Sequence, residues 1–433
     1  MEQAKKQPLL TPLMRWFMLT IVLANIAGAM SPLLMPIYLT ELGASIGQVG
    51  MVFTLSSVAI LILQIGGGWV SDSIGRLRAV AIGSVGGIIG FVMLILAPTW
   101  QWMLVALVVH QIPYALVGPS FSAFLAENSA EEHRGQVYGL TGTIYQVTGI
   151  IGPPLGGFLA GAYGFKAMLG VAALFYFTAA GLRIWMATTM RTPEGQRPKL
   201  STASFKASMG TMVTMLFAGG VITWLFVTDG VSDVAFRMSN ELQPLYVEKI
   251  AGLSLQQIGL LGSASGVAAM FIPLLSGRLS DRYGERVPIA SGFFLLFVAF
   301  MVFLRATTFA AFAVSWALFG VGGTLLGPAY QSLISKVVPS RLLGTFSGVF
   351  DSSRGFIALP APWIGAQLWE RFSPRLPFTI TALAALAVLP PVWLKFKAPA
   401  PGSKGAGEQG SKGAAERRGR GAGEITGEGG VSF

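Results

Sequence analysis

The sequence contains no cysteine, and it is poor in charged residues and in histidine. Its 433 residues include two histidines, and Asp, Glu, Lys and Arg together make up 11%, whereas an ordinary soluble domain has about 25%. The absence of cysteine excludes disulfides, thiol catalysis and cysteine-ligated metal sites, and it leaves the redox compartment open. The low charge argues against a water-soluble fold.

Enzyme motifs are missing too. The sequence has no nucleophile elbow, no phosphate-binding loop and no cluster of metal ligands, which are patterns that mark many catalytic sites. We therefore expect a protein that is not an enzyme and that uses no cofactor and no metal.

Apolar residues are abundant and occur in long runs. They make up 53% of the chain, and a helix of about 20 mostly apolar residues crosses a bilayer. The 55 glycines and 24 prolines fit this picture, because both residues are commoner in membrane helices than in soluble ones. We expect an all-α protein of the lipid bilayer with twelve transmembrane helices, at 15–39, 47–69, 78–97, 101–125, 136–160, 166–188, 213–246, 255–277, 287–305, 309–334, 343–368 and 375–395.

The net charge is +11, and the basic residues fall mainly in alternate loops. With the amino terminus in the cytoplasm, 23 Lys and Arg lie on the cytoplasmic side, 5 lie outside and 2 lie within helices. Cytoplasmic loops of membrane proteins carry such an excess. The start, MEQAKKQPLL, lacks the cleavage pattern of a signal peptide, so the first helix should stay. We expect a multi-pass protein of the cell (plasma or inner) membrane, with both termini cytoplasmic and no nucleic-acid partner.

Two segments interrupt the apolar pattern: TMRTPEGQRPKLSTASFKASMGTM at 189–212, and the tail from 396. The tail has almost no large apolar residue, so burial cannot compensate for the entropy of ordering it. We expect an N-terminal six-helix half at 1–188, a cytoplasmic linker at 189–212, a C-terminal six-helix half at 213–395 and a disordered cytoplasmic tail at 396–433.

The first half of the chain repeats in the second at an offset of 209 residues. This offset pairs Asp72 with Asp281 and Pro119 with Pro328. Aspartates and prolines carry the most weight, because the bias toward Gly and Ala produces matches by chance. The repeat indicates two pseudo-symmetric bundles that arose by duplication.

Two equivalent loops carry one motif, as GWVSDSIGRLR from Gly68 and as GRLSDRYGERV from Gly277. Both resemble the loop signature of the major facilitator superfamily, although Ser73 departs from the basic residue that is usual after the aspartate. The resemblance covers residues 15–395. It implies the major facilitator fold, a small-molecule substrate and a monomer. The motif residues are Gly68, Asp72, Gly75, Arg76, Arg78, Gly277, Asp281, Arg282, Gly284 and Glu285.

In the family that this loop resembles, the loop arginine contacts an acid at the end of helix 4 and holds the halves closed on the cytoplasmic side. Glu127 lies at that end here. The repeat pairs Arg76 with Glu285 and Glu127 with Lys336, so both members of the ion pair change sign together. We expect two conformational latches, Arg76–Glu127 and Glu285–Lys336. The alternative is that all four are solvated loop charges, which contribute little.

Helix 5 contains GLTGTIYQVTGIIGPPLGG, which resembles the glycine–proline motif of the superfamily's drug–proton antiporters, with Thr148 in place of one glycine. Gly and Pro permit a kink or a close approach of helices, which suits a helix that hinges between two states. A plain packing role is the alternative. The motif residues are Gly139, Gly152, Pro153, Gly156 and Gly157.

Helix 7 carries charges at the depth of the bilayer. Asp229, Asp233, Arg237 and Glu241 follow one another at four-residue steps and form one stripe. Such charges normally face a protein interior or a watery cavity, where they bind substrate or carry protons. Asp233, near the middle of the helix, is our first candidate for a proton carrier. The alternative is a ladder of Asp233–Arg237–Glu241 pairs that neutralises itself.

Further candidates come from helices 1, 4 and 11. Asp351 and Arg354 lie in helix 11, and one of them could pair with helix 7 across the cavity. Asn25 in helix 1 is the repeat counterpart of Asp233 if the offset there is 208 residues, as it is between Pro36 and Pro244. His110 lies at mid-depth in helix 4, although a lone buried histidine more often only packs. The proton-coupling candidates are Asp233, Asp229, Glu241 and Asp351, and the substrate-cavity candidates are Asn25, His110, Gln111, Tyr114, Trp224, Arg237, Trp316 and Arg354.

Together these features predict a secondary active transporter of small solutes that works by alternating access. Proton-coupled efflux is the leading version, although helix 1 has no acid and helix 4 has no arginine where many antiporters of the family carry one. Uptake of a small anionic solute together with protons is the alternative, because Arg237 and Arg354 lie at membrane depth. A membrane sensor that moves no solute is a third reading, and sodium could replace protons as the coupling ion.

Overall fold

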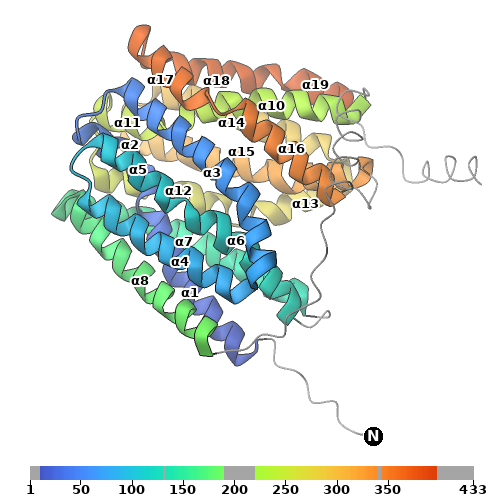
Figure 1. Cartoon of the computed structure of the whole chain (residues 1–433). Helices are drawn as coiled ribbons and strands as arrows, with labels where there is room; N and C mark the ends of the chain where they lie inside the picture. Colours follow the sequence, from blue (N-terminus) through green and yellow to red (C-terminus); the bar gives the residue numbers. More distant parts are fainter. Residues whose placement is uncertain (1–9, 130–132, 190–219, 339–342, 397–433) are drawn as a thin grey trace, which may run out of the picture.

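A computed structural model describes residues 10–129, 133–189, 220–338 and 343–396. Within these ranges most residues are helical and no strand occurs. The helices form two bundles, which lie one above the other in Figure 1 and are built from the two halves of the chain. The predicted linker at 189–212 and tail at 396–433 lie almost wholly outside the described residues.

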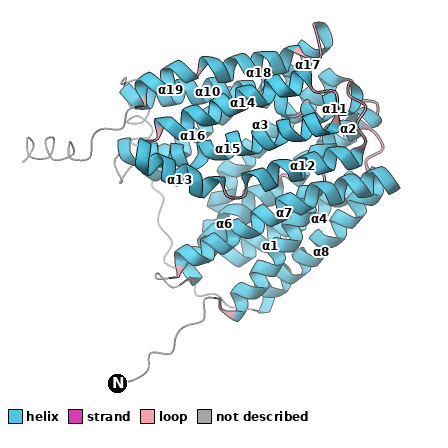
Figure 2. Ribbon diagram, turned by 180° about the vertical axis from the view of Figure 1, so that it is seen from behind, coloured by secondary structure: helices cyan, strands magenta, loops and turns pink. Residues whose placement is uncertain are grey.

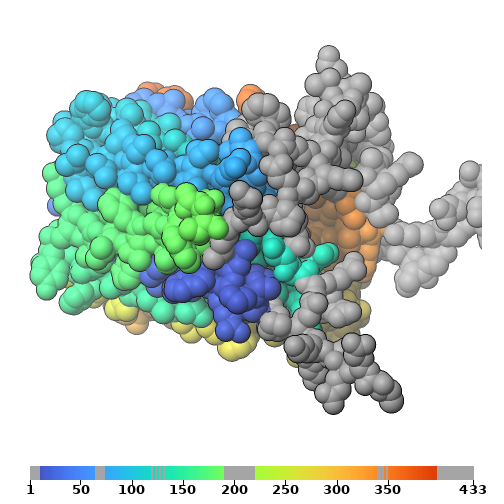
Figure 3. Space-filling view, turned by 60° about the horizontal axis from the view of Figure 1, so that its bottom comes forward, coloured from blue at the N-terminus to red at the C-terminus, as the bar shows by residue number. Residues whose placement is uncertain are grey.

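The first bundle uses residues 12–189 and contains the blue to green helices of Figure 1. On the face seen in Figure 3, α4 and α8 lie side by side, and α1 lies beside α8. The elements of this bundle are α1 (Pro12–Met30), the 3₁₀ turn η1 (Pro32–Leu34), α2 (Met35–Glu41), α3 (Ile46–Ile74), α4 (Arg76–Leu96), α5 (Trp100–His110), α6 (Ile112–Asn128), α7 (Arg134–Tyr163) and α8 (Phe165–Thr189).

The second bundle uses residues 220–395. Figure 2, seen from behind, shows α12 of this bundle beside α7 of the first. Its elements are α10 (Gly220–Asn240), α11 (Gln243–Lys249), α12 (Leu255–Ala269), α13 (Ile272–Tyr283), α14 (Arg286–Arg305), α15 (Phe309–Val337), α16 (Leu343–Ile357), α17 (Ala361–Arg371), α18 (Leu376–Ala387) and α19 (Leu389–Lys395).

Prolines account for most breaks within the spans, because a proline cannot donate a backbone hydrogen bond to the preceding turn. Pro113, Pro244 and Pro273 stand in the first turns of α6, α11 and α13, each directly after another helix. Over the residues that the structure describes, each predicted span thus corresponds to one long helix or to consecutive shorter ones. In the described part of the chain, nine segments are long and apolar enough to cross a membrane. The spans predicted at 136–160, 213–246 and 343–368, which are rich in glycine or carry charges, are not among them.

The repeat extends to details of the backbone. Ser45 and Ser254, which are 209 residues apart, each close a capping box with the glutamine three residues later. Gly75 and Gly284, again repeat partners, have φ angles of +94° and +82°. A side chain would strain this backbone conformation. Both halves therefore begin and end their second long span in the same way.

The two halves contact each other mainly toward one end of the molecule, where α3 packs on α17 and α7 packs on α12. A Cβ added to Gly50 would lie 2.6 Å from the carbonyl oxygen of Pro362, and one added to Gly259 would lie 2.5 Å from that of Pro153. Gly50 and Gly259 are repeat partners, and so are Pro153 and Pro362. One backbone contact is therefore made twice, once on each side of the pseudo-twofold axis.

We call this the closed end; it includes the turns at 42–45 and 250–254. There the Gly47 N–H donates to Glu370 Oε1 across the halves at 2.7 Å. Toward the opposite, open end, glycines such as Gly139 and Gly327 have no atom within 4 Å of an added Cβ. The start of α1 and the end of α19 both lie at the open end (Figure 1).

Candidate functional site

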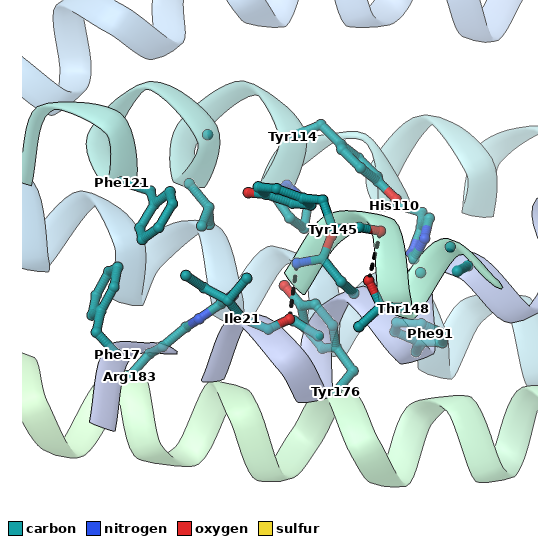
Figure 4. Close-up of a pocket in the computed structure, with 18 residues that line it drawn as sticks. Phe17, Ile21, Phe91, His110, Tyr114, Phe121, Tyr145, Thr148, Tyr176 and Arg183 are labelled. Carbon is teal, nitrogen blue, oxygen red and sulfur yellow. Dashed lines mark hydrogen bonds between the residues drawn. The ribbon is translucent and has the colours of Figure 1, made fainter. Parts of the chain in front are cut away.

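A cavity of about 310 Å³ lies within the first bundle. Aromatic rings form part of its walls, and Figure 4 shows those of Phe17, Phe121 and Tyr145 around the space beside Arg183. Cavities of this size and character are typical of small-molecule sites. The lining residues come from six helices and are Phe17, Ile21, Ala24, Asn25, Gly28, Ala29, Phe91, His110, Pro113, Tyr114, Val117, Gly118, Phe121, Tyr145, Thr148, Gly149, Tyr176 and Arg183.

Three predicted cavity residues line this space: Asn25, His110 and Tyr114. The Asn25 amide donates to the Ile21 carbonyl oxygen at 2.8 Å. The His110 ring lies edge-on to Phe91, with centroids 4.7 Å apart, and its Nδ1 is buried without a hydrogen-bond partner.

The other predicted aromatic and amide residues lie elsewhere. Gln111 is the residue at the break between α5 and α6. Trp316 is 4% exposed and packs against Phe303 in the core of the second bundle, so its large apolar surface serves packing rather than the cavity. Trp224 lies under the ammonium group of Lys395, whose Nζ is 5.6 Å from the ring centroid.

Arg183 was not among the sequence-predicted site residues. It lies near the end of the predicted helix 166–188, where a basic residue is commonly an interfacial charge. In the structure it is only 5% exposed, between α1 and α4. The sequence contains one indication that Arg183 faces the cavity. Tyr176 precedes it by seven residues, so the two side chains lie on the same face of the helix.

The second bundle contains an ion pair between two helices. Arg354 on α16 pairs with the carboxylate of Asp229 on α10, and Asp229 is 8% exposed. Arg354 also lies 3.6 Å from the Asp351 carboxylate, which is largely exposed. An ion pair therefore connects the predicted helix 7, which is α10, to the predicted helix 11, which is α16. The acid in this pair is Asp229 rather than Asp233.

Asp233 lies one turn further along α10 and pairs with Arg237 on the same helix, at 3.1 Å. Glu241 lies just beyond α10, where it accepts a long hydrogen bond from the Asn240 amide at 3.4 Å. Part of the charge ladder considered from sequence is therefore formed, between its first two members.

Of the two expected latches, Glu285–Lys336 lies in the described part. The Lys336 ammonium pairs with the buried Glu285 carboxylate, and the Ser332 hydroxyl donates to the same carboxylate at 2.8 Å. Burial alone would raise the pKa of Glu285, but Lys336, the Glu285 backbone N–H and Ser332 outweigh it and lower the pKa. The pair joins α14 to α15 within one half, so in this conformation it does not hold the halves together.

The remaining motif residues are placed as follows. The side chains of Asp72 and Glu127 lie outside the described residues, as does the surrounding of Gly68. Arg78 and Asp281 are exposed, and the Arg282 guanidinium lies 5.2 Å from the Tyr283 ring centroid.

The glycine–proline motif of α7 packs on two neighbours. Gly152 and Gly156 touch Ala29 and Met30 of α1, whereas Gly157 touches Gly259 of α12. The helix continues through Pro153 and Pro154 without a break. The motif therefore forms part of the contact between the halves at the closed end, while Gly139 faces open space.

Comparison with solved structures supports the fold. Nucleoside transporter NupG superposes with a TM-score of 0.73 at 14% sequence identity, covering 89% of this chain and 100% of that chain. A D-xylose–proton symporter gives a TM-score of 0.68 at 14% identity, covering 89% and 98% of the two chains. At these identities the likeness concerns the fold alone.

The relatives found by sequence similarity have more specific names. Multidrug resistance protein MdtG of Proteus mirabilis is 24% identical over 378 residues, which cover 84% of this chain and 91% of that protein. Multi-drug resistance efflux pump PmrA of Streptococcus pneumoniae is 23% identical over 359 residues, covering 81% and 87%. The sequence model of the Major Facilitator Superfamily matches residues 17–234 and 230–422. The chain therefore belongs to the major facilitator superfamily of membrane transporters.

Proposed function

We propose that this protein is a drug–proton antiporter, which moves small organic solutes out of the cell in exchange for protons. The names of its relatives, a multidrug resistance protein and a multi-drug efflux pump, support efflux over uptake. Solute would bind in the aromatic cavity of the first bundle, and protons would bind to carboxylates of the second.

The observation that carries the proton coupling is the buried Asp229–Arg354 pair. Protonation of Asp229 would remove its charge and weaken its attraction to Arg354, which would then be a partly buried charge without its partner, and such an arrangement is costly. Arg354 lies on α16, which leads through a short break into α17, and α17 packs against α3 at the closed end. A proton at Asp229 can therefore act on the contact between the halves.

Asp233, Glu241 and Asp351 remain candidates for the same role. Asp233 is the next in order, because it lies on the same helix and its pairing with Arg237 neutralises it only locally. Asp351 lies beside Arg354 and could receive the arginine when Asp229 is protonated.

We further propose that the open end faces the cytoplasm. The excess of basic residues on that side supports this orientation. The conformation would then be the one in which an efflux transporter loads its solute. The two latches, Arg76–Glu127 and Glu285–Lys336, would stiffen the halves at this end.

The direction of proton movement tests the proposal against uptake by symport. Purified protein is reconstituted into liposomes that contain a pH-sensitive dye, and a panel of lipophilic cations, neutral aromatic compounds and aromatic carboxylates is added outside. An antiporter moves protons out as solute enters, so the interior becomes alkaline. A symporter acidifies it, and protein-free liposomes correct for leakage.

Asp229→Asn and Asp233→Asn are measured beside the wild type. We expect Asp229→Asn to abolish the proton flux while solute binding remains. Coupled flux at the wild-type rate in both variants would overturn the proton-carrier role, and acidification of the liposomes would favour the symport alternative. Solute binding without any flux would support a sensor.

A further inference from the structure

Arg183 is a buried cation whose partners are all neutral. Its Nε donates to Thr20 Oγ1 at 3.2 Å, one terminal nitrogen donates to Ser84 Oγ at 3.5 Å, and the other donates to the Thr20 carbonyl oxygen at 3.4 Å. These bonds are long and use three of the five N–H groups of a guanidinium. Within the described ranges, no carboxylate forms an ion pair with Arg183.

Such an arrangement is costly in a membrane protein. A charge that is removed from water loses its solvation, and an opposite charge is the usual compensation for that loss. The other buried ions of the described residues are Asp229 and Glu285, and they have partners in Arg354 and Lys336. Within the described part of this half, no charged side chain neutralises Arg183.

The cavity beside Arg183 contains further polar atoms without partners. The Tyr176 hydroxyl is buried and makes no hydrogen bond, and the same holds for His110 Nδ1. Tyr176 is 5% exposed, and both residues line the same cavity as Arg183. Buried polar groups normally have partners, so these atoms indicate that the cavity receives a polar ligand.

The walls of the cavity fit an aromatic ring. Phe17 and Phe121 stack with their centroids 5.2 Å apart, and Tyr114 and Tyr145 lie across the cavity from Arg183 (Figure 4). A volume of about 310 Å³ holds one or two fused rings. The cation suits an anionic group and the aromatic walls suit a ring, so the cavity fits an amphipathic molecule that carries both.

We infer that this cavity is a binding site for aromatic carboxylates, with the carboxylate on the Arg183 guanidinium and the ring between the aromatic walls. An anionic oxygen would occupy the two unused N–H groups, and a charge-assisted pair of this kind is stronger than the present neutral bonds. The inference rests on the proposed function only in naming this solute as cargo, because binding itself requires no proton gradient.

The test measures binding to purified protein in detergent, with naphthoate as the probe. Naphthamide has the same rings without the charge, and acetate has the charge without the rings. We expect naphthoate to bind at least about tenfold more tightly than either, which corresponds to the loss of one charged contact. Equal affinity for naphthoate and naphthamide would overturn the role of Arg183, and equal affinity for naphthoate and acetate would overturn the role of the walls.

Variants test whether Arg183 is the cation that binds the carboxylate. Arg183→Gln should weaken naphthoate binding at least about tenfold and leave naphthamide binding unchanged, while Arg183→Lys retains part of the affinity. Arg305→Gln, which changes an exposed arginine at the end of α14, should have no effect. Tyr176→Phe keeps the ring and removes the unpaired hydroxyl, so it tests the same cavity if Arg183→Gln does not fold. Unchanged naphthoate affinity in whichever of these two variants folds contradicts the inference.

The two proposals fail separately. Absence of naphthoate binding together with proton-driven efflux of another solute would overturn only the carboxylate site. Tight naphthoate binding that depends on Arg183, without any coupled proton flux, would overturn only the antiport function.

Discussion

Glu285 is a buried carboxylate whose partner, Lys336, is 46% exposed at its side chain. Removal of the lysine leaves a buried charge with the Ser332 hydroxyl as its remaining side-chain donor. We expect Lys336→Ala to lower the free energy of unfolding by about 1–3 kcal/mol at neutral pH. Lys166→Ala, at an exposed lysine that starts α8, should change it little. Thermal unfolding in detergent measures both.

The same pair predicts a dependence on pH. Because the folded pKa of Glu285 is lowered, its contribution is present above the pKa of an unfolded glutamate, about 4.3. It is lost as the pH falls through the lower, folded pKa. The difference in stability between wild type and Lys336→Ala should therefore shrink on acidification, and a difference that grows would contradict the pairing.

For single residues, the sequence identifies which charged residues belong to the site better than it identifies which of them pair with one another. Asp229, Asp233 and Arg237 stand out because charge is rare in apolar helices. Which acid joins α10 to α16 depends on how α16 is rotated about its axis, which spacing along one helix does not determine. Arg183 was missed because position near a helix end does not distinguish an interfacial from a buried arginine.

At the scale of the helices, the contacts at the closed end depend on glycine. A Cβ on Gly259 would lie 2.5 Å from the Pro153 carbonyl oxygen, closer than packed atoms approach. We expect Gly259→Ala to disfavour the closed-end contact and to shift the protein toward the state that opens there. Gly181→Ala on α8 adds the same methyl group where no atom lies within 4 Å, and it should leave the equilibrium unchanged.

Since the sequence lacks cysteine, a single introduced thiol reports this shift without background. Glu370→Cys on α17 lies at the contact, where its native carboxylate accepts from Gly47. It should react faster with a maleimide in Gly259→Ala than in an otherwise unchanged protein. Equal rates would mean that the contact does not govern the opening.

The helices themselves were largely predictable. Long apolar runs set their number and order, and capping residues such as Ser45 and Ser254 set where they begin. The breaks were not predicted, because a proline at 113 or 244 either kinks a membrane helix or divides it, depending on the neighbours that satisfy the freed backbone groups.

At the scale of the whole molecule, the repeat and the charge distribution predict its orientation. If both termini are cytoplasmic, the closed end faces outward. An Arg371→Cys variant, at the exposed end of α17, should be labelled in intact cells by a maleimide that cannot cross the membrane. Arg278→Cys on α13, which lies toward the open end, should be labelled only after lysis. The reverse pattern would invert the topology.

Alternating access requires that the two ends open in turn, and pairs of spin labels measure this most directly. One protein carries labels at Lys166→Cys and Arg371→Cys at the closed end, and a second carries them at Gln136→Cys and Arg278→Cys toward the open end. Distances between labels are compared at alkaline and acidic pH, because the account has Asp229 bind the coupled proton. The account predicts that the closed-end distance lengthens while the open-end distance shortens. Two distances that change in the same direction, or that do not respond to pH, would contradict it.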